Sequence, residues 1–274
     1  PAFGHSGEQT LDVLMAGQGG FDHNRQTLRI VEQIERRFPG WPGLNLTWEV
    51  REGLVKHETE YDISDDRGFE PDLACSLEGQ IANAADELAY TAHDLDDGLR
   101  SGLITAAELR DVTVWRELAA DLGIDPLCDL SKVERHRVVR SLVGWGVNDV
   151  ANTTAQRLAD EGIDSLGKLR GRPGQLIGFS EDGGTRHREL KSFLYQRLYH
   201  HWRVVRMSAK ARRVLCALFN TYAQEPAQLP DSVQLRIDAS GDSQERIICD
   251  YMAGMTDRFA MEEHAKLFDP SVRV

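Results

Sequence analysis

The spacing of apolar residues is the feature that most constrains how this chain of 274 residues can fold. Large apolar side chains recur every three or four positions through most of it, as in Leu109, Val112, Trp115, Leu118 and Leu122. An α-helix turns once in 3.6 residues, so this spacing places the apolar side chains on one face of a helix, where they can pack into a core. The chain is therefore predicted to be all-α.

Three stretches interrupt this pattern: residues 39–46, 57–71 and 171–185, each rich in Gly, Pro or acidic residues. Such composition is typical of loops. Within the third stretch, the run Ser-Glu-Asp-Gly-Gly at residues 180–184 resembles a linker most, and we expect a mobile connection there before a helix that begins near Arg186. A short strand pair near residues 233–238 is the one expected exception to a helical fold.

Acidic residues outnumber basic ones, 44 to 32, and the formal net charge is −12. An acidic surface repels phosphate backbones, so sequence-independent binding of nucleic acid requires a local basic patch. The best candidate is residues 200–213, for which a solvated basic face is the simpler explanation; a nucleic-acid partner is possible but not indicated. No run approaches the roughly 20 apolar residues of a membrane span. We expect a soluble, cytoplasmic protein with no membrane partner.

The first eight residues, Pro-Ala-Phe-Gly-His-Ser-Gly-Glu, combine an imidazole and a carboxylate in a turn that contains two glycines. His5 and Glu8 are three residues apart, and such positions lie on one side of a helical turn. The Glu8 carboxylate can therefore fix the tautomer of the His5 imidazole while that imidazole moves a proton. This pairing suits phosphate chemistry, with His5 and Glu8 as candidate catalytic residues.

Residues 76–102 predict a helix with two distinct faces. Its packed stripe is expected to consist of Ile81, Ala85, Leu88, Ala92, Leu95 and Leu99. On the opposite side, Asp86, Tyr90 and Asp94 follow at i, i+4 and i+8, along one line. Two carboxylates and a phenol can ligate a metal, stack on a sugar and accept a hydroxyl proton. A solvated polar face explains the same spacing, and from the spacing alone it is the simpler alternative.

Arg197 is a candidate for a different reason. At 100° per residue it lies in the middle of an apolar stripe formed by Leu190, Phe193, Leu194, His201 and Val204. Burying an unpaired guanidinium is prohibitive, so Arg197 is expected to meet either a carboxylate from another helix or an anionic ligand. The residues alone leave both alternatives open.

Several of these segments resemble motifs of one family, the HD-superfamily dNTP triphosphohydrolases of the bacterial dGTPase-like kind. Residues 1–8 look like the segment that follows the family's His-Asp pair, and residues 83–94 look like its second signature. Residues 195–201 are similar to a family helix whose Arg contacts substrate phosphates, and residues 250–260 to a further signature. The family's first His and its His-Asp pair would precede Pro1, so we expect a part of a longer chain, one that by itself holds little metal and can be inactive.

The resemblance implies an HD-domain helical bundle with a C-terminal helical extension. Residues 1–125 would form the HD-domain core without its upstream metal-ligand helices. Residues 126–186 would form a helical insertion with a mobile loop, and residues 187–274 a C-terminal helical region that completes the nucleotide site.

The resemblance also implies a role for each candidate. Asp86 would be a ligand of a divalent metal, either manganese, iron or magnesium. Tyr90 would pack on the deoxyribose and Asp94 would receive its 3′-hydroxyl, while Arg197 and Lys56 would clamp the triphosphate. His23 lies in a segment similar to one in which a family His reaches the triphosphate, so it is the second choice for proton or phosphate work; a capping loop, with Asp22 or Asn24 as the cap, is the simpler alternative.

The expected function is metal-dependent hydrolysis of dNTPs, dGTP among them, to deoxynucleoside and inorganic triphosphate by a homo-oligomer. Two alternatives stay open. One is an HD-type phosphodiesterase or phosphatase acting on another nucleotide, which would not need Tyr90 and Asp94 as a sugar-binding pair. The other is a non-catalytic oligomeric helical module that binds dNTP or single-stranded nucleic acid.

Overall fold

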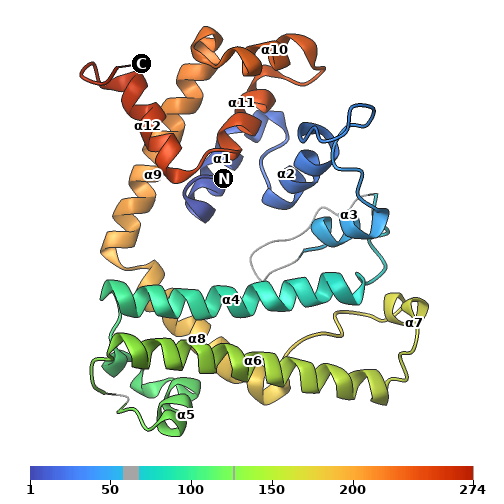
Figure 1. Cartoon of the computed structure of the whole chain (residues 1–274), viewed down its shortest axis with the longest axis vertical. Coiled ribbons are helices and arrows are strands. Elements are labelled where there is room, and N and C mark those ends of the chain that lie inside the picture. The colour runs from blue at the N-terminus through green and yellow to red at the C-terminus, as the bar shows by residue number, and fades with distance from the viewer. Residues whose placement is uncertain (58–67, 126, 274) are drawn as a thin grey trace. The chain divides into compact units, whose positions relative to one another are not determined.

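The chain folds into helices joined by loops (Figure 1). The computed structural model describes residues 1–57, 68–125 and 127–273. Among these residues no strand forms, and the only β-type pairings are two isolated bridges, Arg36 with Gly43 and Phe38 with Trp41. The all-α prediction is confirmed. In the same part of the chain, no helix combines the length and the apolar character that crossing a bilayer requires.

The described residues form two compact units, residues 1–44 with 202–274, and residues 45–201. The first unit is built around α9 (Trp202–Gln224), against which α1 (Gly4–Leu14), α11 (Gln244–Ala253) and α12 (Asp257–Phe268) pack. Its remaining elements are η1 (Ala16–Gln18), α2 (His23–Arg29), η2 (Ile30–Ile34), η5 (Pro226–Gln228) and α10 (Asp231–Ala239). Leu11 of α1, Leu215 of α9 and Ile248 of α11 are fully buried in its core.

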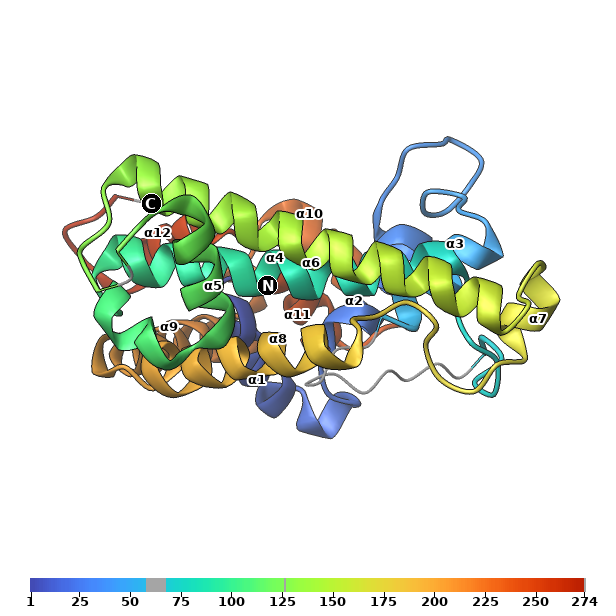
Figure 2. The ribbon, with the colours of Figure 1, turned by 90° about the horizontal axis from the view of Figure 1, so that it is seen from below.

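The second unit is organised by two long helices, α4 (Leu77–Ser101) and α6 (Lys132–Asp160), which lie side by side in Figures 1 and 2. They can approach closely because residue 146 is a glycine: a Cβ added there would lie 2.3 Å from Leu88 Cδ2. Packed with them are α5 (Thr113–Leu122) and α8 (Glu181–Leu194). The other elements are α3 (Trp48–Val55), η3 (Ala106–Asp111), α7 (Leu166–Arg170) and η4 (Tyr195–Tyr199).

The predicted helix over residues 76–102 is confirmed as α4. Ser76 caps its first turn by accepting a hydrogen bond from Gly79 N, and Gly102 ends it with a left-handed φ of 67°. Its predicted apolar stripe is only partly buried. Leu88 and the positions after it pack into the core, whereas Ile81 is 55% exposed.

Residues 233–238 lie in α10, so the expected strand pair is wrong. Apolar residues alternate at Val233, Leu235 and Ile237, as they would in a strand. In the helix, however, Val233 and Ile237 are one turn apart and both pack on the core of the first unit, while Leu235 is 67% exposed.

The mobile connection expected at residues 180–184 is also wrong. Ser180 is the N-cap of α8, and its hydroxyl accepts a hydrogen bond from Gly183 N at 3.0 Å. Asp149 of α6 holds this cap, accepting hydrogen bonds from Ser180 N at 2.8 Å and from Ser180 Oγ at 2.7 Å. Residues 39–46 and 171–180 are non-helical, as predicted; residues 58–67 of the remaining predicted loop lie outside the described residues.

Candidate active site

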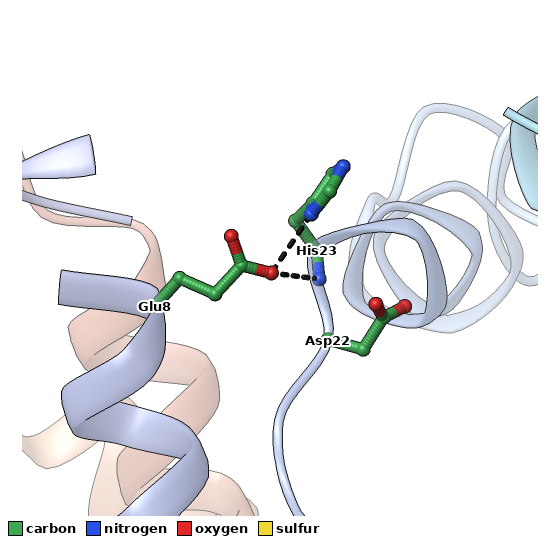
Figure 3. Close-up of side chains that lie close together, drawn as sticks. All are labelled: Glu8, Asp22 and His23. Carbon is green, nitrogen blue, oxygen red and sulfur yellow. Dashed lines mark hydrogen bonds and ion pairs between the residues drawn. The ribbon is translucent and has the colours of Figure 1, made fainter. Parts of the chain in front are cut away.

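A hydrogen-bonded pair, Glu8 and His23, forms the centre of the first group of candidate residues (Figure 3). One carboxylate oxygen, Glu8 Oε1, lies 2.8 Å from His23 Nδ1 and accepts a hydrogen bond from the backbone N of His23 at 2.9 Å. An ionised carboxylate can only accept, so the proton of the imidazole is on Nδ1. The side chains are 17% and 29% exposed, respectively, which leaves the pair accessible.

The two residues come from different helices, and contacts of two aspartates position His23. Glu8 is on α1, and His23 is the first residue of α2. Asp22 caps α2 by accepting a hydrogen bond from Arg25 N at 2.8 Å. Asp12 of α1 accepts one from Phe21 N at 2.9 Å, which ties the preceding loop back to α1. His23 is therefore positioned by a cap and by a loop anchor, both made by aspartates.

The Glu8 carboxyl group stays ionised in this setting. Burial raises its pKa, but the hydrogen bonds from the His23 side chain and backbone, together with the charges of His23 and His5, outweigh burial, so the pKa lies below its usual value. Glu8, Asp22 and His23 each offer a ligand atom, and these atoms lie within 4.8 Å of one another. Two carboxylates and an imidazole are donors that suit manganese, iron or magnesium.

Sequence reasoning singled out His5, Glu8 and His23, but it did not pair Glu8 with His23. His5 and Glu8 do lie three residues apart on α1, as predicted, and His5 is exposed. The hydrogen-bond partner of Glu8, however, is His23 rather than His5. Asp22 was weighed only as a cap and missed as a possible ligand, although its position directly before His23 was a usable signal.

The second group of candidates lies on α4, in the unit of residues 45–201. Asp94 accepts a hydrogen bond from the hydroxyl of Tyr199, which comes from η4. The Tyr199 ring also stacks with Tyr90, with ring centroids 6.4 Å apart. Tyr199 thus contacts two of the three residues on the predicted polar line. Sequence reasoning missed Tyr199, because nothing local connects residues 105 positions apart.

The environment of Asp94 changes its acidity. Burial, with a further contribution from the charge of Asp97, raises the pKa of Asp94 to about 6. The Asp94 carboxyl group therefore gains or loses its proton just below neutral pH. A ligand hydroxyl group near Asp94 would therefore find an ionised acceptor only above about pH 6.

Asp86, the predicted metal ligand, lies on the exposed part of α4 with 57% of its side chain accessible. His57 Nε2 lies 3.5 Å from Asp86 Oδ2, and His57 Nδ1 hydrogen-bonds to Asn83 Oδ1 at 2.5 Å. One imidazole thus bridges two α4 residues that are three positions apart. The role of Asp86 as a metal ligand stays a prediction.

Lys56 is buried, and its ammonium group is fully used within the protein. It donates to Glu52 Oε1 at 2.9 Å and to the carbonyl oxygens of Glu70 at 2.8 Å and Leu73 at 2.7 Å. Glu52, which is fully buried, also accepts two hydrogen bonds from Arg170. This geometry fixes the backbone near residue 70; a contact from Lys56 to phosphate, which stays a prediction, would require one of these bonds to open.

The expectation that Arg197 is buried in an apolar stripe is wrong. Its side chain is 61% exposed, and Arg197 Nη1 lies 4.0 Å from Glu108 Oε1. The reason is that residues 195–199 form a π-helical turn, which holds more residues than an α-helical turn. After Leu194, the core position is therefore taken by Leu198, four residues on, and not by Arg197. A phosphate contact by Arg197 stays a prediction.

Comparison with known proteins shows the family to which the chain is related. Residues 177–266 match the model of the phosphohydrolase-associated domain. A protein of Geobacter sulfurreducens is 43% identical over 279 residues, which cover 99% of this chain and 71% of that protein. A protein of Deinococcus deserti is 44% identical over 98% of this chain and 68% of its own length. Both carry the name deoxyguanosinetriphosphate triphosphohydrolase-like protein.

The chain belongs to this family. A Caulobacter vibrioides protein of the same name, 40% identical over 98% of this chain and 72% of its own length, agrees. The resemblance drawn from the motifs is therefore confirmed, and the chain is a triphosphohydrolase-like enzyme with an all-α fold.

Proposed function

We propose that this triphosphohydrolase-like enzyme hydrolyses deoxynucleoside triphosphates, dGTP among them, to a deoxynucleoside and inorganic triphosphate. The observation that carries the proposal is the Glu8–His23 pair, an oriented imidazole within a segment that resembles the family motif. The names of the relatives support the substrate class. In this reaction a water-derived hydroxide attacks the α-phosphorus, the bond from that phosphorus to the 5′-oxygen breaks, and the 5′-oxygen takes up a proton.

His5, Glu8 and His23 are proposed to handle that proton. Because Glu8 holds the proton of His23 on Nδ1, His23 can exchange a second proton at Nε2. His5 lies near enough for its charge to lower the pKa of Glu8. We propose that His5 delivers the proton to the leaving 5′-oxygen, as the resemblance implies. Glu8 is proposed to orient the imidazole of His23.

Tyr90, Asp94 and Tyr199 are proposed to recognise the sugar. An ionised Asp94 would accept a hydrogen bond from the 3′-hydroxyl, and Tyr199 holds Asp94 in place through its own hydroxyl. The ring of Tyr90, packed against C2′, would leave no room for a 2′-hydroxyl. The exposed guanidinium of Arg197 is proposed to contact the triphosphate, with Lys56 as a further phosphate contact.

A divalent cation, manganese, iron or magnesium, is proposed as the cofactor. Asp86 would hold it, as the resemblance implies, and the carboxylates of Glu8 and Asp22 with His23 form a second donor set of suitable chemistry. When bound, such a cation offsets negative charge on phosphoryl oxygens. A homo-oligomeric state and a cytoplasmic location stay predictions.

The test is a product analysis with a panel of dNTPs, NTPs and cyclic nucleotides, each with manganese or magnesium. We expect inorganic triphosphate and deoxynucleoside, detected by phosphorus NMR and chromatography, from dNTPs alone. Release of monophosphate or pyrophosphate instead would contradict the proposal and favour a phosphodiesterase or phosphatase. Nucleotide binding without any product would favour a non-catalytic module.

A further inference from the structure

An apolar groove of about 890 Å³ opens at the end of the second unit where α7 lies (Figures 1 and 2). Its walls come from α3, from the first turns of α4, from the last turn of α6, and from α7 with the loop before it. The larger apolar side chains along these walls include Val50, Leu54, Leu77, Leu158, Ile163 and Leu166. The volume lies in the upper part of the range for binding sites in proteins, and none of the candidate residues described above lines the groove.

Two glycines line the groove where α3 packs on α4. A Cβ added to Gly79 would lie 3.5 Å from Gly53 Cα, and one added to Gly53 would lie 3.9 Å from Gly79 Cα. The two backbones therefore lie against each other with no side chain between them, and the space that side chains would fill is left open. Among the apolar residues beside these glycines, Val50 and Leu166 are 50% and 52% exposed.

The groove is continuous with the exposed part of the apolar stripe on α4. From Leu88 onwards this stripe packs into the core, whereas Ile81, one turn after Leu77, is 55% exposed. Leu77 and Ala82 line the groove itself. Burial of apolar surface is worth roughly 25 cal/mol per Å². An apolar groove that runs into an exposed apolar stripe therefore favours a partner that covers both.

The charged residues that line the groove are all acidic: Glu49, Glu78 and Asp164. Asp164 is paired with Lys168 at 3.0 Å. Glu49 and Glu78 lie in the first turns of α3 and α4; both are exposed, and neither forms an ion pair with a described residue. Apolar walls beside these two carboxylates are complementary to a partner that carries apolar and cationic groups together.

The lining residues distinguish between the ways in which such a partner can bind. Addition of a strand requires an exposed sheet edge, and no strand forms in the described part of the chain. Docking of a proline-rich segment requires an aromatic-lined groove, and among the described lining residues none is aromatic. A small-molecule site has polar groups that converge on the ligand, whereas no polar side chain among these lining residues is buried. The mode that fits is a helix whose apolar face lies in an apolar groove.

We propose that this groove binds an amphipathic helix of a partner protein, one with Lys or Arg next to its apolar face. The apolar face fills the groove and covers Ile81, and the cations meet Glu49 and Glu78.

The proposal goes beyond the hydrolase activity and is tested without it. The probe is a fluorescent peptide of about 14 residues, built from Leu and Lys, with Leu at the three- and four-residue spacing of one helical face. Its binding to the whole chain is followed by anisotropy over a series of salt concentrations. A second peptide keeps the Leu positions and has Glu in place of Lys.

Two pairs of substitutions are compared. The groove pair is Val50→Ser with Leu166→Ser. The control pair is Val147→Ser with Leu127→Ser, at residues that are 50% and 58% exposed elsewhere in the same unit. Circular dichroism checks that each variant is folded.

We expect the Lys peptide to bind the wild-type chain and the groove pair to weaken that binding roughly 10-fold or more, because the exposed half of each apolar side chain would leave water on binding. The control pair should bind like wild type. The Glu peptide should bind more weakly than the Lys peptide.

The two carboxylates are tested separately. Glu49→Gln with Glu78→Gln should weaken binding of the Lys peptide more at low salt than at high salt, because salt screens the charge pairs that these substitutions remove. Asp121→Asn with Glu181→Gln, at exposed acids of the same unit, changes the net charge equally and should bind like wild type.

Absence of binding at low salt, equal weakening by the groove pair and its control, or tighter binding of the Glu peptide would overturn the proposal. Sedimentation without peptide tests a second copy as the occupant: self-association of wild type that the groove pair abolishes would also overturn it. Displacement of the peptide by dodecyltrimethylammonium at equal concentration would show a site for small cationic amphiphiles and would overturn it as well.

Discussion

At the scale of single residues, the carboxylate of Glu8 and the imidazole of His23 come from two helices and share a hydrogen bond. Replacing Glu8 by Gln removes the charge that keeps the His23 proton on Nδ1. We expect Glu8→Gln to slow dNTP hydrolysis, and His5→Ala or His23→Ala to slow it further, by roughly 10² to 10⁴-fold, the contribution of a general acid or base. Single-turnover rates measure this. Gln9→Ala, an exposed neighbour on α1, is the control; a wild-type rate in Glu8→Gln would remove the pair from the reaction.

Asp94 gives a pH dependence with a defined sign. Its pKa of about 6 lies above the usual carboxyl value, so the group is protonated as pH falls through 6 and then no longer offers an ionised acceptor. We expect the KM for dGTP to rise as pH falls through about 6. Asp94→Asn should flatten that dependence. Tyr199→Phe should move it to higher pH, because the phenol donates to the carboxylate and stabilises its ionised form.

The raised pKa of Asp94 also affects the free energy of unfolding, which this group lowers as pH rises. A carboxyl group whose pKa is raised on folding costs stability as pH rises from its unfolded value towards 6, because the folded chain then holds a proton that the unfolded chain has lost.

A KM profile that is flat in wild type, or identical in Tyr199→Phe, would contradict the proposed role of Asp94.

At the scale of elements, the start of α8 depends on a glycine. A Cβ at residue 183 would lie 2.4 Å from Asp149 Oδ2, the group that holds the Ser180 cap. Gly183→Ala is therefore expected to displace Asp149 and to lower the free energy of unfolding by about 1 to 3 kcal/mol.

Gly144 is the matched control, because it lies within α6 and a Cβ there would meet nothing within 4 Å. Gly144→Ala should raise the free energy of unfolding by about 0.5 to 1 kcal/mol, since alanine loses less backbone freedom on folding. Chemical denaturation measures both variants. Equal and small effects would show that α6 and α8 adjust to the extra methyl group.

At the scale of the whole molecule, the hydrophobic clusters of the two compact units share no residues among those that the structure describes. Leu215→Ala opens a cavity in the core of the first unit and should cost about 2 to 5 kcal/mol. We expect hydrogen exchange to accelerate in residues 1–44 and 202–274 more than in residues 45–201. Leu142→Ala, in a core of the second unit, should give the reverse pattern. Uniform acceleration in both variants would show that the chain opens as one cooperative unit.

The sequence by itself determined the all-α fold, the bounds of α4 and the residues worth examining. Helical periodicity, a Ser N-cap and a Gly C-cap act within a few residues, so they can be read from neighbours along the chain. The motifs worked in the same way: residues 1–8 and 83–94 each carry their pattern in one segment, and the family they indicated is the one to which the chain belongs.

Tertiary structure decided which of these residues meet. The bond from Glu8 to His23 spans 15 residues, and the bond from Tyr199 to Asp94 spans 105. Neither separation is the three or four residues that bring side chains together on one helix, so each of these bonds depends on how different helices pack. Local patterns misled where packing overrode them: a π-helical turn moved Arg197 outward, and Asp149 turned a run that resembles a linker into the start of α8. Periodicity predicts which face of an isolated helix is apolar. Which helix packs against that face, and which side chains then meet, is decided only by the packing of the helices in the folded chain.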